Sequence, residues 1–305
     1  MRKSMSILPR ERLAEPRTLL MPGAFNAMSA RIIADGGYPV MALSEYAVAA
    51  SLLGTADRGL VTLDEMAATA RYITAAVQTP LLVDAGRGHG NAINAMRAAE
   101  MFIQAGVVGM HMGDHDGLGD AIPVEEAAGK IAAYVHVREK MDPDFLVIAR
   151  LDGGRGDGQT AETMVHRAKA YGAAGADLIY PRGLSGADEI AHMWEAAMTL
   201  LVLDLVLDLV LDRGTGTRLP ASGVAILSHE DQALQRSAGS VWDYLQGFAA
   251  EDVDYVLRFL DQVKQHPTGN MHEFVGFPAI RELEERFLPR EDVVARYENS
   301  LGYKP

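Results

Sequence analysis

Charged and imidazole side chains stand at the ends of short apolar segments in this chain. Asp84, His111 and Arg150 each lie at or near the end of such a segment. A carboxylate is an oxygen ligand for a hard divalent ion. A buried arginine requires an anionic partner, and an imidazole exchanges protons near neutral pH. Together these residue types predict a catalytic site for a small anionic substrate.

The same residues also have structural interpretations. Asp84 can cap the following helix, Arg150 can pair with Asp152, and a single histidine can be packed or solvated. Another possibility is a transition-metal site rich in histidine, because imidazole suits zinc, iron or nickel better than magnesium. Its candidate ligands lie near two successive segment ends and are Asp84, His89, His111, Asp114 and His115.

Short apolar runs alternate with longer stretches of helical period from about residue 18 onward. This alternation is typical of repeated βα units around a parallel sheet. The candidate strands are eight runs, at 18–21, 40–43, 81–84, 109–112, 146–150, 178–180, 200–203 and 224–228. Helical stretches between them include 62–77, 92–104 and 160–171. The pattern predicts an α/β fold, a closed (β/α)8 TIM barrel, whose strand ends would bring the polar residues together.

The chain after the eighth run reads as helices without a linker rich in proline, glycine or serine. Amphipathic stretches at 232–247 and 252–265 are followed by a connector and a final helix within 269–287. We therefore expect a single domain over residues 1–305. It would consist of a barrel at about 16–230 and a helical C-terminal extension at about 231–305.

One acidic repeat stands out within the seventh βα unit. Asp204, Asp208 and Asp212 recur every four residues between leucines and valines. This spacing puts them on one face of a helix and also on one face of a strand, so periodicity alone does not decide between the two. We favour a strand near Leu200 followed by a short amphipathic helix.

Composition excludes several classes of function. The formal net charge of -13 and the pI of about 5.1 argue against a nucleic-acid partner, which needs a basic surface. The absence of cysteine rules out disulfides, thiolate metal sites and a cysteine nucleophile. The N-terminus lacks the apolar run of a secretory signal, so we expect a cytoplasmic protein that does not associate with membranes.

Four phrases, in this order and spacing, are specific to one family. They are Pro-Gly-Ala-Phe-Asn-Ala-Met-Ser-Ala at 22–30, Ala-Ala-Ser-Leu-Leu-Gly at 49–54, Asp-Ala-Gly-Arg-Gly-His-Gly-Asn at 84–91 and Asp-Pro-Asp-Phe-Leu-Val-Ile-Ala-Arg at 142–150. The chain resembles the isocitrate lyase and phosphoenolpyruvate mutase superfamily over residues 16–200 and again at 274–287, and poorly at 200–223. The resemblance implies a barrel whose eighth helix is exchanged between subunits of a homo-oligomer, a dimer or tetramer.

The resemblance also implies a site in which a 2-oxo or 2-hydroxy carboxylate chelates Mg²⁺ while an enolate forms. Asp84 and Asp114 would hold the metal, and Asp84, His111 and Arg150 would be catalytic. The expected substrate-binding residues are Asn26, Ser44, Glu45, Tyr46, Asp57, His89 and Arg182. Mn²⁺ could replace Mg²⁺, or the metal could have been lost.

The chain departs from the family pattern at several acidic positions and lacks one loop. Gly86, Gly113 and Arg182 stand where relatives have acidic residues, and Glu45 replaces a glycine. The loop with a catalytic cysteine is absent, because only residues 115–122 separate the fourth strand from the next family phrase. We expect a lyase that breaks or forms a carbon–carbon bond beside a carboxylate. The alternatives are a phosphonate mutase or hydrolase acting on a phosphorus–carbon bond, and a catalytically silent barrel that binds carboxylates.

Overall fold

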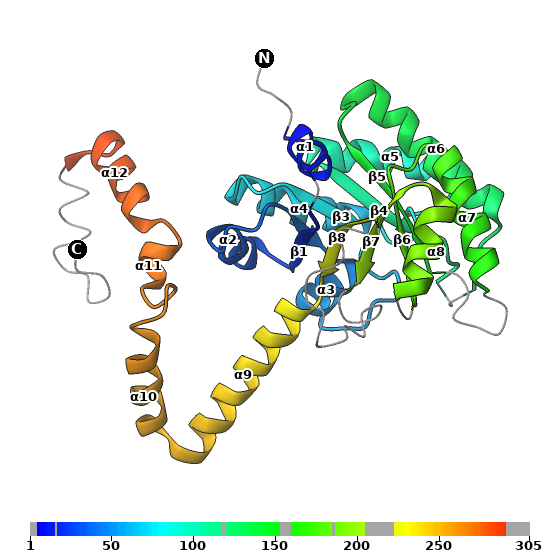
Figure 1. The fold of residues 1–305 in the computed structure, drawn as a ribbon. Helices are drawn as coiled ribbons and strands as arrows, with labels where there is room; N and C mark the ends of the chain where they lie inside the picture. Colours follow the sequence, from blue (N-terminus) through cyan, green and yellow to red (C-terminus); the bar gives the residue numbers. More distant parts are fainter. Residues whose placement is uncertain are drawn as a thin grey trace. The chain divides into compact units, whose positions relative to one another are not determined.

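The protein is represented by a computed structural model that describes residues 5–15, 17–117, 120–152, 160–184, 187–204 and 223–290. Eight parallel strands form a closed barrel in chain order, as the sequence predicts (Figure 1). The strands are β1 (Leu19–Ala24), β2 (Met41–Leu43), β3 (Leu81–Asp84), β4 (Gly109–Gly113), β5 (Leu146–Leu151), β6 (Leu178–Pro181), β7 (Leu200–Asp204) and β8 (Val224–His229). Each predicted run overlaps one strand.

The strands direct alternate side chains toward the barrel interior. Leu82 and Ile148 belong to a buried cluster drawn from strands around the whole barrel. Successive side chains of a strand point to opposite faces, so Asp84 and Arg150, two residues further along, also point inward. His111 pairs in register with Asp84. All three residues therefore meet at the carboxyl ends of the strands, where barrel enzymes carry their sites.

Helices cover the outside of the barrel, and the helical stretches predicted between the strands are confirmed. The elements are α1 (Ile7–Leu13), α2 (Ala27–Asp35), α3 (Glu45–Val48), the π-helical η1 (Ala49–Leu53), α4 (Leu63–Ala76), α5 (Ala92–Gln104), α6 (Val124–Met141), α7 (Ala161–Ala173) and α8 (Ala187–Ala197). At the start of α4, Thr62 and Glu65 form a reciprocal capping box. This cap satisfies backbone donors that the first turn leaves without partners.

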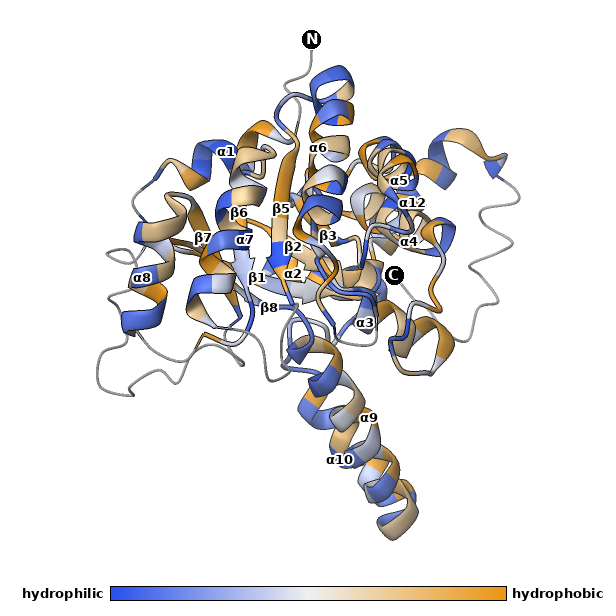
Figure 2. Ribbon diagram, turned by 90° about the vertical axis from the view of Figure 1, so that its right-hand side faces the viewer, coloured by the Kyte–Doolittle hydropathy of each residue, from blue (hydrophilic) through white to orange (hydrophobic). Residues whose placement is uncertain are grey.

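The chain divides into two compact units, Met1–Ser237 and Ala238–Pro305. The helical character predicted for the C-terminal extension is confirmed by α9 (Gln232–Glu251), α10 (Val253–Val263), α11 (Met271–Phe274) and α12 (Phe277–Phe287). No residue of these four helices is buried. Figure 2 shows both apolar and polar residues along α9 and α10, while β5 and β7 are mostly apolar. The single-domain organisation of residues 1–305 stays a prediction.

The seventh βα unit is only partly described. The predicted strand near Leu200 is confirmed by β7, which ends at Asp204. The predicted amphipathic helix, with Asp208 and Asp212, lies outside the described residues. Within the described ranges, no helix is long and apolar enough to cross a membrane.

Candidate active site

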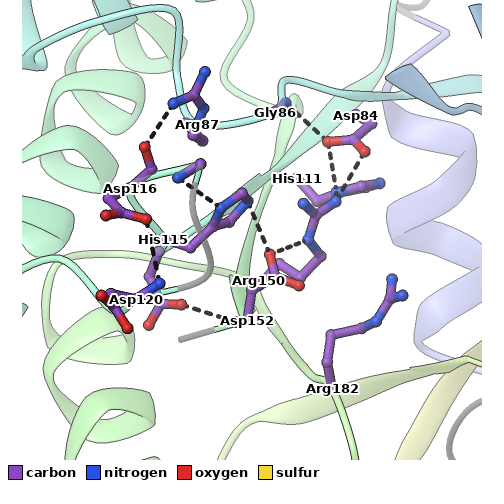
Figure 3. A network of polar contacts seen from close by, with 12 residues as sticks. Asp84, Gly86, Arg87, His111, His115, Asp116, Asp120, Arg150, Asp152 and Arg182 are labelled. Atoms are coloured by element: carbon purple, nitrogen blue, oxygen red, sulfur yellow. Dashed lines mark hydrogen bonds and ion pairs between the residues drawn. The ribbon is translucent and has the colours of Figure 1, made fainter. Parts of the chain in front are cut away.

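A buried arginine lies between two carboxylates at the open ends of β3 and β5. Arg150 donates from Nη1 to Oδ2 of Asp84 at 2.9 Å and from Nε to Oδ2 of Asp152 at 2.6 Å (Figure 3). Burial alone would raise the pKa of Asp84, but Arg150 and His111 hold it well below its usual range. The structural pairing of Arg150 with Asp152 is thus present, and Asp84 shares the same guanidinium.

His111 lies between two acidic residues in the barrel interior. Its Nδ1 is 3.4 Å from Oδ1 of Asp84, and its Nε2 is 3.3 Å from Oε1 of Glu230. Burial lowers the pKa of His111, but the two carboxylates outweigh burial and raise it. The ring of Tyr180 packs edge-on against the imidazole at 5.6 Å between centroids. The imidazole is therefore fixed in place with a carboxylate on either side.

Sequence reasoning missed Glu230. It follows β8, and Ser228 two residues earlier donates its hydroxyl to Oε1 of Glu230 at 2.8 Å. Gly23 on β1 makes room for this segment, because a Cβ there would overlap the backbone of Glu230. Alternation from Ile226 through Ser228 could have placed Glu230 on the inward face, but the family phrases carry no signal at this position.

Three side chains could hold a divalent ion. Asp84, His111 and Glu230 each offer a ligand atom, and these atoms lie within 4.8 Å of one another. Two ligands bound to one metal at about 2.1 Å lie roughly 3–3.4 Å apart at coordination angles near 90–110°. The 3.3 Å between Nε2 of His111 and Oε1 of Glu230 matches this value, and this nitrogen has no aligned hydrogen-bond partner within the described structure. The 3.4 Å contact of Asp84 is with Nδ1 on the other side of the ring, and one ion can bind only one of the two nitrogens. The residues fit a metal, and the imidazole favours Mn²⁺, Fe²⁺ or Zn²⁺ over Mg²⁺.

Asp114, expected as a metal ligand, is engaged elsewhere. Its Oδ1 accepts from the backbone of Asp152 at 2.8 Å, and its Oδ2 accepts from the hydroxyl of Tyr171 at 2.8 Å. Arg167 on α7 lies 3.1 Å from the same carboxylate. Asp114 is fully buried and is not part of the Asp84, His111 and Glu230 cluster. A metal-binding role for Asp114 stays a prediction.

Gly86 and Gly113 stand where relatives have acidic residues, and a carboxylate from elsewhere in the chain occupies the space beside each of them. A Cβ at Gly86 would overlap the carboxylate of Glu45, and a Cβ at Gly113 would overlap that of Asp152. Burial, followed by repulsion from Asp84, raises the pKa of Glu45 to about 8. Acidic groups from α3 and from the residue after β5 thus stand where the glycines lack side chains.

Replacing Gly86 by alanine should displace the Glu45 carboxylate and lower the free energy of unfolding by about 1–3 kcal/mol through overpacking. Gly37→Ala is the matched control, because both glycines have positive φ but the Cβ at Gly37 meets open space. Chemical denaturation of both variants measures the difference. An equal loss in the two proteins would show that backbone strain alone is responsible. Adding Glu45→Ala should recover stability in Gly86→Ala.

The remaining expected site residues differ in their surroundings. Ser44 caps α3 and donates to Oδ1 of Asp231 at 2.8 Å. Asn26 caps α2 in a reciprocal box with Ser29. Arg182 lies 3.7 Å from the carboxylate of Asp204 and over the ring of Tyr180.

Three further candidates lie around Glu45 and the loop after β3. Tyr46 on α3 is 44% exposed. The carboxylate of Asp57 accepts from the backbone of Gly59 at 3.4 Å and contributes to the raised pKa of Glu45. His89 follows β3 and lines a cavity. Their roles in substrate binding stay predictions, as do those of Ser44, Asn26 and Arg182.

Comparison with known proteins points to one family. Residues 10–247 match the model of the family described as phosphoenolpyruvate phosphomutase. Carboxyvinyl-carboxyphosphonate phosphorylmutase of Arabidopsis thaliana is 31% identical over 94% of this chain and 83% of its own length. 2,3-Dimethylmalate lyase of Eubacterium barkeri is 34% identical over 61% of this chain and 66% of its own length.

A solved structure agrees with these sequence comparisons. Phosphonopyruvate hydrolase in complex with oxalate and Mg²⁺ superposes with a TM-score of 0.81 at 25% identity. The superposition covers 94% of this chain and 100% of that protein. The likeness therefore extends over nearly the whole chain.

Proposed function

Because this chain belongs to the phosphoenolpyruvate phosphomutase family, we propose that it is an enzyme acting on a small carboxylic acid, specifically a carbon–carbon lyase. Its substrate would be a 2-oxo or 2-hydroxy acid, with a bond beside the carboxylate broken or formed through an enolate. The observation that carries the proposal is the buried pair of Arg150 and Asp84 beside His111 at the carboxyl ends of the strands. Similarity to 2,3-dimethylmalate lyase supports the lyase assignment.

Arg150 is placed to hold the substrate carboxylate. Its Nε and Nη1 are fixed by Asp152 and Asp84, while no bond from Nη2 is found within the described structure. A guanidinium whose plane is already fixed loses little conformational entropy when its remaining donors bind an anion. Arg150 would therefore orient the carboxylate without having to move.

His111 and the two acidic residues around it would exchange protons with the substrate and help to stabilise its negative charge. The imidazole can hold or release a proton between Asp84 and Glu230. Asp84 and His111 are buried, and the side chain of Glu230 is 10% exposed. A divalent ion bound by these three residues would stabilise the negative charge of an enolate. Glu45, whose pKa is about 8, would remain protonated at neutral pH and could donate a proton in place of the missing cysteine loop.

A phosphonate substrate is the second candidate. The chain has no cysteine that could serve as the lyase acid, and two of its similar proteins are named for phosphonate chemistry. A turnover screen with Mn²⁺ or Mg²⁺ present, using 2-methylisocitrate, 2,3-dimethylmalate and phosphonopyruvate, tests both proposals. Product from a hydroxy acid supports the lyase, and product from phosphonopyruvate alone overturns it. Oxalate binding with no turnover would establish a silent carboxylate-binding barrel.

We also propose that α9 to α12 are covered by a second copy of the chain. These helices bury no residue, yet Trp242, Leu245, Leu257 and Leu283 are about half exposed or more. Apolar faces of this size are unfavourable in water and are typical of oligomer interfaces. Exchange of these helices between barrels would cover them in a dimer or tetramer.

Light scattering should give a mass that is a multiple of 32.9 kDa. Leu257→Asp, which puts a charge on the apolar face of α10, should shift the protein toward smaller species. Asp254→Asn on the same helix is the control, because an exposed acidic residue contributes little to such a contact. A wild-type monomer would contradict the exchange.

A further inference from the structure

A cavity of about 670 Å³ lies beside the Asp84 and Arg150 pair, among the loops that follow β2, β3 and β4. Its basic side chains are Arg87, Arg97 and Lys130, and two histidines, His89 and His115, also line it. Asp116, Glu126 and Glu45 are its acidic residues. Asp116 and Glu126 are exposed, so solvent screens their charge.

Two of the cations are held in place without a buried carboxylate partner. Lys130 is 5% exposed, and its Nζ lies 3.4 Å from the carbonyl oxygen of Arg87 and 3.3 Å from the half-exposed carboxylate of Glu126. Arg87 donates from Nη1 to the carbonyl oxygen of Asp116 at 2.7 Å. In the described part of the chain it forms no ion pair. Lys130 favours an anionic ligand, because a buried charge needs a counter-charge. Arg87 is partly exposed and lies on the same cavity.

His89 provides independent evidence of a binding site. Its φ is 56°, a left-handed conformation that is uncommon for a residue with a side chain. Its Nε2 is buried and has no hydrogen-bond partner within the described structure. An unsatisfied buried nitrogen costs free energy, and backbone strain of this kind gathers at ligand-binding sites. Contacts within the described residues explain neither cost, and His89 lines the cavity.

Two residues that line the cavity, His115 and Glu45, also lie next to the catalytic centre. Nε2 of His115 is 3.8 Å from Oδ2 of Asp152, the same oxygen that accepts from Arg150. Glu45 packs over Gly86, two residues after Asp84. Figure 3 shows Arg87 and His115 on one side and Asp84 and Arg150 on the other side of this boundary. The cavity and the catalytic centre are therefore neighbours.

We propose that Arg87, Lys130 and His89 bind a second anionic group of the substrate, a carboxylate or phosphonate. The inference rests on the proposed function, in which Arg150 binds the first carboxylate. It narrows the substrate class to acids whose two anionic groups are separated by several bonds. A compact 2-oxo acid would leave the cavity to water.

The test compares three probes by calorimetry in the presence of Mn²⁺. Oxalate is too short to span both places, tricarballylate carries three separated carboxylates, and inorganic phosphate is a free anion. Arg87→Met and Lys130→Met should each weaken tricarballylate binding about tenfold, the loss of one charged hydrogen bond. Oxalate binding should stay within about twofold, because the variants do not touch Arg150. Arg71→Met, an exposed change on α4, is the matched control.

Each other outcome overturns the inference in a recognisable way. Unchanged tricarballylate binding with intact oxalate binding refutes the second subsite and leaves the proposed function standing. Failure of the wild-type protein to bind either acid refutes both. Loss of phosphate binding alone would show a separate anion site. Thermal unfolding checks that the variants fold, and Arg87→Met, on a partly exposed loop, carries the test if Lys130→Met does not fold.

Discussion

Arg150→Met should lower the free energy of unfolding by about 3–5 kcal/mol and abolish oxalate binding. Arg150 is the cation beside the buried carboxylate of Asp84 and the partly exposed carboxylate of Asp152, so its removal leaves both without their main counter-charge. Chemical denaturation measures the first effect and calorimetry the second. The sequence allows Arg150 to pair with Asp152 but does not show that Asp84 shares the same guanidinium.

Two further substitutions separate the effect of Arg150→Met on stability from its effect on oxalate binding. Asp84→Asn and Asp152→Asn, added to Arg150→Met, remove the orphaned charges and should recover at least half of the lost stability without restoring oxalate binding. Arg138→Met is the control for losing an arginine, because its partner Asp177 keeps a 2.9 Å contact with Arg10. Recovery of oxalate binding in the triple variant would contradict the role of Arg150.

The fold could be predicted because its signals are local and repeated. Each strand is a short buried run, and helix starts carry caps such as Thr62 with Glu65 and Asn91 with Asn94. A closed barrel follows from eight such units with parallel pairing. The C-terminal helices were also foreseen, but local periodicity does not say what covers their apolar faces.

The site was predictable only where a side chain lies at a strand end. Asp84, His111 and Arg150 follow from strand alternation and from the family phrases, and they do lie together. Close approaches between neighbouring βα units have no signal in the family phrases. Glu230 comes close because Gly23 leaves space, and Glu45 reaches across to Gly86. Such complementary pairs are far apart in sequence and have no common motif.

Asp114 shows how one acidic residue can have two interpretations. An acidic residue just after a strand suggests a ligand, but a carboxylate can equally anchor a neighbouring helix. Here Tyr171 and Arg167 of α7 approach it, and it also accepts from the backbone of Asp152. Only three-dimensional contacts distinguish an anchoring carboxylate from one that faces the substrate. The difference can be measured by metal binding.

Glu230→Gln should weaken Mn²⁺ binding by at least about tenfold, since it removes one charged oxygen from the Asp84, His111 and Glu230 set. Asp114→Asn should leave Mn²⁺ affinity within about twofold and instead lower the unfolding temperature, because it weakens the buried contacts with Tyr171 and Arg167. Calorimetric titration with Mn²⁺ and thermal unfolding, each with and without a chelator, separate the two effects. A ligand that binds only the folded state raises its stability, so the chelator should lower the unfolding temperature of the wild type and have little effect on Glu230→Gln. If Asp114→Asn abolishes Mn²⁺ binding while Glu230→Gln does not, the metal is held by Asp84 and Asp114, and Glu230 serves only to fix the imidazole of His111.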